Sequence, residues 1–547
     1  MFIEKLTRRL QSVRGPRDIF FLSLLVLLLL WQPTYLHQEL NLFEWGLYLP
    51  GIDAVSHGQV PFRDFFHLRG PFELYLPALF MKIFGFRADI LSAYFYLGTV
   101  LTILVAVLIA YELIQQRLLL YAFVLIIVTK TFPRVVFTFW GGMRYAWGLL
   151  AVWCLVRFFK SSRPGWLLAG GCLAAVALLT SIEIGVIVLI AFMSAMAFSR
   201  ECRRRSWIFL SGFLIIALPY GIYMFGQNAG MPYLQAQWIV VTHLQKTFFQ
   251  IGRVPDTVPK LLHAVFFPLD KSFYKTTPIY SFMFFFILYF WRVYYKKVAG
   301  LDQAALVVAV YGLVSFLTGF RNLWFAEYEM SLQPDKIVLF YLLGQFIVWA
   351  QTKFARFKWV GAILLAAVAI SSVIYFTGRF KTRFYRTSWV KQLISGRQQQ
   401  RELINGSPVS LIDLPRIRHM TVPTWQAEDL EQLKRFVDEH VPAHEVVWMY
   451  PELGGLHFIL DRPWVGRFPM ATFFWMDEGW FTDYEKTLEA NPPRYAIINK
   501  VMPFYFKNIY FQVTANRLKH ELMMQFLKDH YRIEGQTPTY FIYSRVD

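Results

Sequence analysis

Apolar segments alternate with short polar connections over the first two thirds of the chain. Most segments have roughly the length that crosses a membrane as a helix. This pattern predicts a polytopic α-helical membrane protein with about eleven transmembrane helices. The predicted helices lie near residues 19–35, 90–113, 118–135, 144–159, 165–181, 184–198, 207–225, 278–292, 302–320, 336–351 and 359–377.

The pattern changes after Thr377, and from there to Asp547 charged, polar and apolar residues are intermixed. The first part of this region, to about residue 424, is rich in Arg, Gln and Pro and is expected to be a connector. The remainder shows helical and strand periodicity. Helices are predicted over 427–440 and 514–531, and strands at Val446–Tyr450, Phe458–Leu460, Tyr495–Asn499 and Tyr540–Ser544. We therefore expect a transmembrane module, 1–377, and a C-terminal α/β domain, 378–547.

Composition supports a membrane protein, since 56% of residues are hydrophobic, only 17% are charged and the mean hydropathy is +0.40. Soluble domains carry about 25% charged residues, so an ordinary soluble enzyme is excluded. The net charge of +19 lies largely in short basic clusters between apolar segments, which indicates topology rather than a nucleic-acid partner. The three cysteines, Cys154, Cys172 and Cys202, have no metal-type spacing and predict neither a disulfide framework nor a zinc site.

Every second short connection is basic, and these basic connections fall on the side of the N-terminus. Because positive residues favour the cytoplasmic side, the N-terminus is predicted to be cytoplasmic. The first loop, 37–89, and the C-terminal domain are then extracytoplasmic. We expect a multi-pass protein of a bacterial inner (plasma) membrane. The basic residues concerned are Arg117; Arg157, Lys160 and Arg163; Arg200, Arg203, Arg204 and Arg205; Arg292, Lys296 and Lys297; and Lys353, Arg356 and Lys358.

The first loop contains most of the candidate catalytic residues. Residues 41–86 are too polar to span a membrane and too aromatic for a free linker, so we expect short helices at the membrane surface, with 72–84 half-embedded. Asp53 and Glu73 are expected to be surface or capping residues. The charged and titratable side chains of the loop include Glu44, Asp53, Asp64, His67, Arg69 and Glu73.

Acids, aromatics, glycines and prolines follow a pattern along this loop, formed by Glu44, Trp45, Gly46, Tyr48, Gly58, Pro61, Phe62, Arg63, Asp64, His67, Arg69, Gly70, Pro71 and the run from Tyr75 to Gly85. The pattern resembles the first loop of the C-type (GT-C) membrane glycosyltransferases. Within that superfamily it is similar to the polyprenyl-phosphate-sugar-dependent RgtA/B/C/D-like and protein mannosyltransferase groups. The resemblance implies a GT-C-like fold.

The resemblance places the family's first-loop acid on Glu44, where the family pattern usually has Asp, and its second acid on Asp64. The family's basic residue before Gly-Pro, often Lys, is Arg69 here. Arg321 resembles a basic position that the superfamily places near the donor phosphate. His67, Arg63 and Trp45 are candidates for supporting the loop and the acceptor.

Sugar transfer from a lipid phosphate to a hydroxyl needs a carboxylate to accept the hydroxyl proton and cations to stabilise the departing phosphate. Glu44 or Asp64 can be this base, and the two can exchange roles. The second carboxylate can orient the acceptor or help to hold a divalent metal ion, so such a cofactor stays open. The alternatives are a turn or helix cap for Asp64, and a solvated acid or an ion pair with Arg63 or Arg69 for Glu44.

Donor-phosphate binding is assigned to basic residues at the predicted outer end of the helices. Arg134 and Arg144 bracket a short outer loop, and a charge inside a membrane is a functional candidate by default. The alternative for Arg144 is an interfacial side chain that reaches lipid phosphates. The donor-phosphate candidates are Arg69, Arg134, Arg144 and Arg321.

These observations predict an inverting hexosyl- or pentosyltransferase. It would transfer a sugar from a polyprenyl-phosphate donor to a glycan, lipid or protein acceptor on the outer face of the membrane. The chain has no P-loop and no GxGxxG motif, which fits a lipid-linked donor. The alternative is a lipid-linked glycan transporter or flippase, or a polysaccharide polymerase. A transporter would be expected to show inverted repeats and midplane charges, for which the sequence gives no convincing sign. A receptor or scaffold would tolerate replacement of the first-loop acids.

Overall fold

The chain folds into two compact units, each built from segments that lie far apart in the sequence. Unit 1 comprises 1–34, 95–219 and 256–398, and unit 2 comprises 35–94, 220–255 and 399–547. Unit 2 thus joins the first loop to the C-terminal region. The computed structural model describes residues 13–30, 40, 42–130, 142–244, 259, 273–319, 333–353, 358–379, 408–418, 420–451, 453–470, 476–502 and 510–546.

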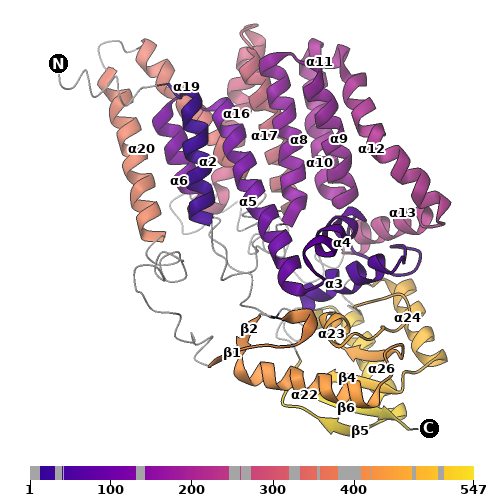
Figure 1. Cartoon of the computed structure of the whole chain (residues 1–547). Coiled ribbons are helices and arrows are strands. Elements are labelled where there is room, and N and C mark those ends of the chain that lie inside the picture. The colour runs from indigo at the N-terminus through magenta and orange to yellow at the C-terminus, as the bar shows by residue number, and fades with distance from the viewer. Residues whose placement is uncertain are drawn as a thin grey trace. The chain divides into compact units, whose positions relative to one another are not determined.

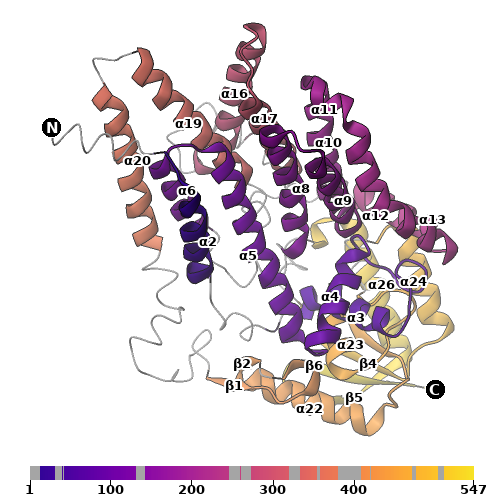
Figure 2. The same ribbon diagram turned by 45° about the horizontal axis from the view of Figure 1, so that its top comes forward.

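Unit 1 is a bundle of helices that lie side by side in Figures 1 and 2. Two of its helices continue into unit 2, namely α5 at its start and α12 at its end. The helices are α2 (Pro16–Leu30), α5 (Ala88–Leu113), α6 (Arg117–Lys130), α8 (Gly142–Ser161), α9 (Pro164–Thr180), α10 (Ile182–Phe198), α11 (Arg200–Arg204), α12 (Ser206–Gly226), α16 (Phe273–Tyr294), α17 (Gly300–Gly319), α19 (Gln333–Lys353) and α20 (Lys358–Arg379).

Four helices of the described part of the chain are long and apolar enough to cross a membrane: Ala88–Leu113, Ser206–Gly226, Gly300–Thr318 and Gly361–Gly378. Shorter apolar helices are Arg117–Val128, Pro164–Thr180, Ile182–Phe198 and Pro278–Tyr294. The polytopic helical fold is therefore confirmed, whereas the number of about eleven spans stays a prediction. The predicted break between 165–181 and 184–198 is confirmed, because Ser181 separates α9 from α10.

Three of the basic connections that predicted the topology are paired with acids of neighbouring helices in unit 1. Arg117 Nε lies 2.8 Å from Asp18 Oδ1, and Arg157 Nη1 lies 2.7 Å from Glu112 Oε1. Lys160 also contacts Glu112, and Arg292 contacts Asp302. Each acid is almost fully buried, and a buried charge is tolerated when it is paired and hydrogen-bonded. These pairs connect helix ends within the bundle.

The C-terminal part of unit 2 is a small α/β domain. Its main sheet has the strand order β3-β4-β6-β5, with β3 and β4 parallel and the other neighbours antiparallel. The short strands β1 and β2 form a separate antiparallel pair. Its elements are β1 (Val409–Leu411), β2 (Thr421–Pro423), α22 (Thr424–His440), β3 (Val447–Tyr450), α23 (Gly454–Leu460), α24 (Glu478–Ala490), β4 (Tyr495–Asn499), α26 (Thr514–His530), β5 (Tyr531–Gln536) and β6 (Tyr540–Arg545), with single 3₁₀ turns at Pro415–Ile417 and Tyr510–Gln512.

Most predicted elements of this domain are confirmed, but one is wrong, and β1, β2, α24 and β5 were not predicted. The predicted strand Phe458–Leu460 is wrong, because these residues end the helix α23. All seven residues of α23 are buried, and a continuous apolar run does not distinguish a buried helix from a buried strand. The strand β5 was not predicted. It follows α26 without a loop and alternates poorly between buried and exposed positions.

The first loop forms two helices of unit 2, α3 (Leu42–Ser56) and α4 (Phe72–Phe84), as expected for a surface segment. Helix α3 packs against α23, and the two ribbons adjoin in Figures 1 and 2. Arg416 strengthens this packing, because it donates to Asp53 Oδ2 at 2.8 Å and to Asp461 Oδ1 at 2.6 Å. Asp53 is thus a link to the α/β domain rather than a solvated acid. The remaining helix of unit 2, α13 (Gly230–Ile239), continues as a π-helical turn over Val240–Leu244.

The contact of α3 with α23 depends on two glycines. A Cβ atom added at Gly46 would lie 2.7 Å from Gly454 Cα, and one added at Gly454 would lie 2.8 Å from Gly46 Cα. Both distances are shorter than carbon atoms tolerate, so any side chain here would push the helices apart. Because Glu44 lies two residues before Gly46 on α3, this packing holds the segment of backbone that carries Glu44.

We expect Gly46→Ala to destabilise the protein by about 1–3 kcal/mol, the usual cost of overpacking. The matched control is Gly226→Ala at the end of α12, where an added Cβ would meet no atom within 4 Å. The control should stay within about 0.5 kcal/mol of the wild type. Thermal unfolding in detergent measures both variants. Equal stability of Gly46→Ala and Gly226→Ala would show that α3 and α23 do not need this close approach.

Candidate active site

Glu44 lies in the first turn of α3, and its side chain is buried, with 5% of its surface exposed. Tyr48 follows one turn later and is also buried. Residues four apart lie on the same face of a helix, so the carboxylate and the phenol share one face of α3. The first turn of a helix also favours a negative charge, because the backbone N–H groups point toward it.

Arg69 joins α3 to α4. Its Nη1 donates to the Tyr48 hydroxyl on α3, and to Glu73 Oε1 in the first turn of α4 at a distance of 3.1 Å. The guanidinium carbon also lies 5.8 Å from the centre of the Tyr48 ring. Arg69 and Glu73 are four residues apart, a spacing that allows such pairing at a helix start. A cation is thereby fixed beside the face of α3 that carries Glu44.

The buried environment of Glu73 was not predicted from the sequence. This residue was expected at the surface or as a cap, but its side chain is only 5% exposed and paired with Arg69. The expectation is wrong because Glu73 lies on the face of α4 that packs inward, together with Leu74, Pro77 and Met81. The spacing of Arg69 and Glu73 was the available signal for the ion pair.

His67 completes a buried group that we call the first-loop cluster: Glu44, Tyr48, His67, Arg69 and Glu73. His67 Nε2 lies 4.0 Å from Glu73 Oε2, and neither atom has a hydrogen-bond partner within the described residues. Burial lowers the pKa of His67 to about 3, the nearby Arg69 charge adds to this effect, and a hydrogen bond with the Leu47 backbone opposes it. The imidazole is therefore neutral near pH 7. A water bound between the two atoms could donate one hydrogen bond to each and satisfy both.

Asp64 has a different environment from Glu44. Both of its carboxylate oxygens accept hydrogen bonds from Arg63, at 2.7 and 2.8 Å, and Oδ2 also accepts one from the Val60 amide at 2.7 Å. The hydrogen bond from Arg63 is the main cause that lowers the pKa of Asp64, and the Val60 amide adds to it against the effect of burial. Arg63 Nη1 also donates to Gln227 at 2.9 Å. Asp64 thus closes the turn 60–64, the alternative left open by the sequence.

The other sequence candidates are distributed over both units. Trp45, the next residue of α3 after Glu44, is fully buried. In unit 1, Arg144 lies in the first turn of α8 with 5% of its surface exposed, and its Nη2 donates to the Tyr145 hydroxyl at 3.2 Å. Arg134 and Arg321 lie outside the described residues. Of the four donor-phosphate candidates, the structure brings Arg69 into the first-loop cluster.

A metal site has little support from the side chains that the structure describes. Across the described ranges, no group of three or more His, Cys, Asp and Glu side chains could hold an ion. Asp64, one of the two predicted ligands, is instead bound by Arg63 and Val60.

The chain is similar to one protein-family model and to several solved structures. A family model described as dolichyl-phosphate-mannose-protein mannosyltransferase matches residues 69–223, which include Arg69, Glu73 and Arg144. The solved structure of ArnT from Cupriavidus metallidurans bound to undecaprenyl phosphate has a TM-score of 0.53 to this chain at 11% identity, and the match covers 97% of this chain and 99% of that one. The fold is that of the GT-C glycosyltransferases. A search of curated proteins found no match.

The GT-C fold is also found in a second structure, the archaeal oligosaccharyltransferase AglB from Archaeoglobus fulgidus in complex with an inhibitory peptide and a dolichol-phosphate. Its TM-score is 0.50 at 11% identity, and the match covers 97% of this chain and 74% of that one. These likenesses confirm the predicted fold class, including a polytopic helical part and a C-terminal α/β domain. Together with the span-length apolar helices, they indicate a multi-pass membrane protein.

Because buried His67 is neutral near pH 7, the folding stability of the chain is expected to depend on pH. Histidine in an unfolded chain binds a proton near pH 6.5, whereas folded His67 does so only near pH 3. Between these values the unfolded state binds more protons, so folding stability falls as the pH drops below about 6.5. One such group changes the stability by at most about 1.4 kcal/mol per pH unit. We expect His67→Gln to reduce this slope in thermal unfolding measured from pH 7.5 to 5.

The control for this experiment is His57→Gln, because His57 lies in the same loop with 70% of its side chain exposed. This variant should keep the slope of the wild type. Part of the slope will remain in His67→Gln, since burial also lowers the pKa of His457, to about 4, and that of His520. Identical slopes for His67→Gln and the wild type would contradict a buried, neutral His67.

Proposed function

We propose that the chain is an inverting membrane glycosyltransferase. It transfers a sugar, hexose or pentose, from a polyprenyl-phosphate donor to a hydroxyl of a glycan, lipid or protein acceptor on the outer face of a bacterial inner membrane. The observation that carries this proposal is the first-loop cluster. It combines a buried carboxylate, Glu44, with a cation, Arg69, that is fixed by Tyr48 and Glu73.

The proposed reaction is a single displacement at the anomeric carbon of the donor. The acceptor oxygen attacks this carbon from the face opposite to the phosphate, the bond between carbon and phosphate oxygen breaks, and polyprenyl phosphate leaves. Glu44 accepts the proton of the attacking hydroxyl as general base. Arg69 stabilises the charge that develops on the leaving phosphate, and Arg144, Arg134 and Arg321 are proposed as further donor-phosphate residues.

Asp64 is proposed to maintain the loop rather than to act as the base, since a carboxylate with a lowered pKa is the weaker proton acceptor. Arg63 and Trp45 support the same loop. The unpartnered atoms His67 Nε2 and Glu73 Oε2 are proposed to bind a hydroxyl of the acceptor or a water that contacts it.

The solved relatives support a lipid-phosphate donor for this function. ArnT was solved with undecaprenyl phosphate, and AglB with a dolichol-phosphate and an inhibitory peptide. A polyprenyl phosphate is therefore the leaving group that we propose for this chain, and the acceptor is left as a glycan, lipid or protein.

The test is a transfer assay in membranes from cells that express the chain. A panel of radiolabelled polyprenyl-phosphate sugars is supplied together with native acceptor lipids and glycans, and membranes without the chain serve as the control. We expect one donor to be consumed, with release of polyprenyl phosphate and a product of inverted anomeric configuration. Consumption of no donor would contradict the proposal and favour a transporter or polymerase.

A further inference from the structure

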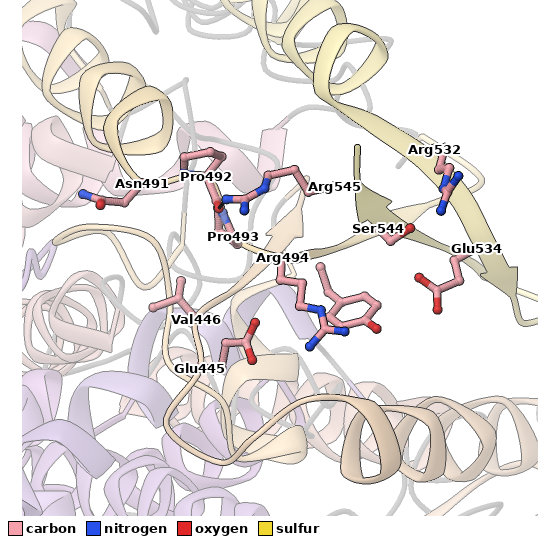
Figure 3. Close-up of a pocket in the computed structure, with 11 residues that line it drawn as sticks. Glu445, Val446, Asn491, Pro492, Pro493, Arg494, Arg532, Glu534, Ser544 and Arg545 are labelled. Carbon is pink, nitrogen blue, oxygen red and sulfur yellow. Dashed lines mark hydrogen bonds between the residues drawn. The ribbon is translucent and has the colours of Figure 1, made fainter. Parts of the chain in front are cut away.

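A polar pocket lies in the α/β domain, and none of the first-loop residues lines it. It has a volume of about 820 Å³ and is located where β4 begins and β6 ends (Figure 3). This volume falls within the range of small-molecule sites, about 300–1,000 Å³. The lining residues are Glu445, Val446, Asn491, Pro492, Pro493, Arg494, Tyr495, Arg532, Glu534, Ser544 and Arg545.

The base of this pocket is a row of side chains across three strands. Tyr495 on β4 pairs in register with Ser544 on β6, and Ser544 pairs with Arg532 on β5. Directly opposed residues of antiparallel strands point to the same face of the sheet. An aromatic ring, a hydroxyl and a guanidinium therefore lie next to one another on a rigid surface. The rings of Phe436 and Tyr495 pack edge to face, with their centres 5.8 Å apart.

Two further arginines, Arg494 and Arg545, lie beside this row. Arg545 Nη1 donates to the Pro492 carbonyl at 2.9 Å, which anchors the rim of the pocket. Arg494 lies over the Tyr495 ring, with its guanidinium carbon 5.3 Å from the ring centre. Neither Arg494 nor Arg532 forms an ion pair within the described residues, although Glu445 and Glu534 line the same pocket (Figure 3). Two guanidinium groups thus remain available to an anion.

The pocket combines two kinds of recognition groups. Guanidinium groups bind carboxylate or phosphate oxygens, often through two parallel hydrogen bonds. Glu445, Glu534 and Asn491 can accept hydrogen bonds from hydroxyl groups, and Ser544 can both donate and accept them. A ligand that satisfies both sets carries an anionic group together with several hydroxyls, and this is the chemistry of an acidic sugar.

We propose that this pocket is a binding site for an acidic saccharide. Arg494 and Arg532 bind its carboxylate or phosphate group, and the glutamates, Asn491 and Ser544 bind its hydroxyls. The site is separate in its residues from the first-loop cluster, so it goes beyond the transfer reaction and does not depend on it. It gives the α/β domain a carbohydrate-binding role of its own.

The experiment measures binding to the full-length protein by isothermal titration calorimetry. The protein is placed in phosphatidylcholine nanodiscs, so that no anionic lipid competes. The probes are trigalacturonate and glucose 1-phosphate as acidic sugars, maltotriose as a neutral sugar, and inorganic phosphate as a bare anion. We expect at least one acidic sugar to bind at least tenfold more tightly than both maltotriose and phosphate.

The variant Arg494→Gln/Arg532→Gln should weaken binding of the acidic sugar at least tenfold. The matched control is Arg517→Gln, an exposed arginine on α26 that does not line the pocket, and it should bind like the wild type. Thermal unfolding confirms that both variants are folded. The proposal is overturned if neither acidic sugar binds, if maltotriose or phosphate binds equally well, or if the double variant retains wild-type affinity. Because binding is measured without a donor, failure of the transfer assay would leave this result unaffected.

Discussion

Replacing Glu44 by Gln is expected to lower the rate of sugar transfer by about 10²–10⁴-fold, the usual contribution of a general base. The amide has nearly the shape of the carboxylate but cannot accept the proton of the attacking hydroxyl. Glu44 is buried at the start of α3, where the surrounding structure fixes its position. The rate is measured in the membrane assay with the donor that the wild type consumes, at equal protein level.

The matched control for Glu44→Gln is Asp64→Asn in the same loop. Because Arg63 and the Val60 amide already bind the Asp64 carboxylate, we expect this change to reduce transfer less than tenfold and to act mainly on loop stability. Thermal unfolding separates the two effects. Loss of transfer in Asp64→Asn with wild-type stability, together with retained activity in Glu44→Gln, would reverse the proposed roles of the two acids.

The variant Arg69→Met is expected to destabilise the protein by about 3–5 kcal/mol, because it leaves the buried Glu73 carboxylate without its cation. Glu73→Gln should cost less, since Arg69 keeps its hydrogen bond with Tyr48 and its side chain is 16% exposed. In the double variant Arg69→Met/Glu73→Gln no unpaired charge remains, and most of the stability should return. Thermal unfolding of the four proteins gives the coupling energy of the pair.

The double variant also distinguishes a structural from a catalytic role of Arg69. If Arg69 stabilises the departing phosphate, the double variant will be stable yet at least about 10²-fold slower in transfer than Glu73→Gln alone, in the range seen when one stabilising donor is removed. Recovery of both stability and transfer would show that Arg69 only compensates the charge of Glu73. The donor phosphate would then have to be bound by the other arginines.

The sequence predicted much of the fold because the main signals are local. Span-length apolar segments such as 207–225 predict helices directly, and α12 (Ser206–Gly226) matches that segment closely. The strands Val446–Tyr450 and Tyr495–Asn499 were found for the same reason, since their composition and alternation are local properties. The segment Phe458–Leu460 failed because burial on all sides removes the periodicity that separates a helix from a strand.

The candidate site was predicted only in part. The sequence identified the first loop and the residue types needed for sugar transfer, so Glu44, Asp64, His67 and Arg69 were named without a structure. It did not distinguish the two acids, because their difference depends on contacts. Asp64 is bound by Arg63 and the Val60 amide, whereas Glu44 is buried on the face of α3 that also carries Tyr48.

By itself, the sequence determined that this is a multi-pass membrane protein with an acidic and aromatic first loop and a C-terminal α/β domain. The length and the composition of each segment can be read directly from the sequence. Only the tertiary structure decided that the first loop packs with the C-terminal domain, through Gly46 and Gly454. It also decided that Glu73 is buried and paired with Arg69. The same holds for Arg494 and Arg532, which line one pocket. The physical reason is that packing, burial and ion pairing depend on which side chains meet in space. Residues such as Gly46 and Gly454, separated by most of the chain, leave no periodic trace of their contact in the sequence.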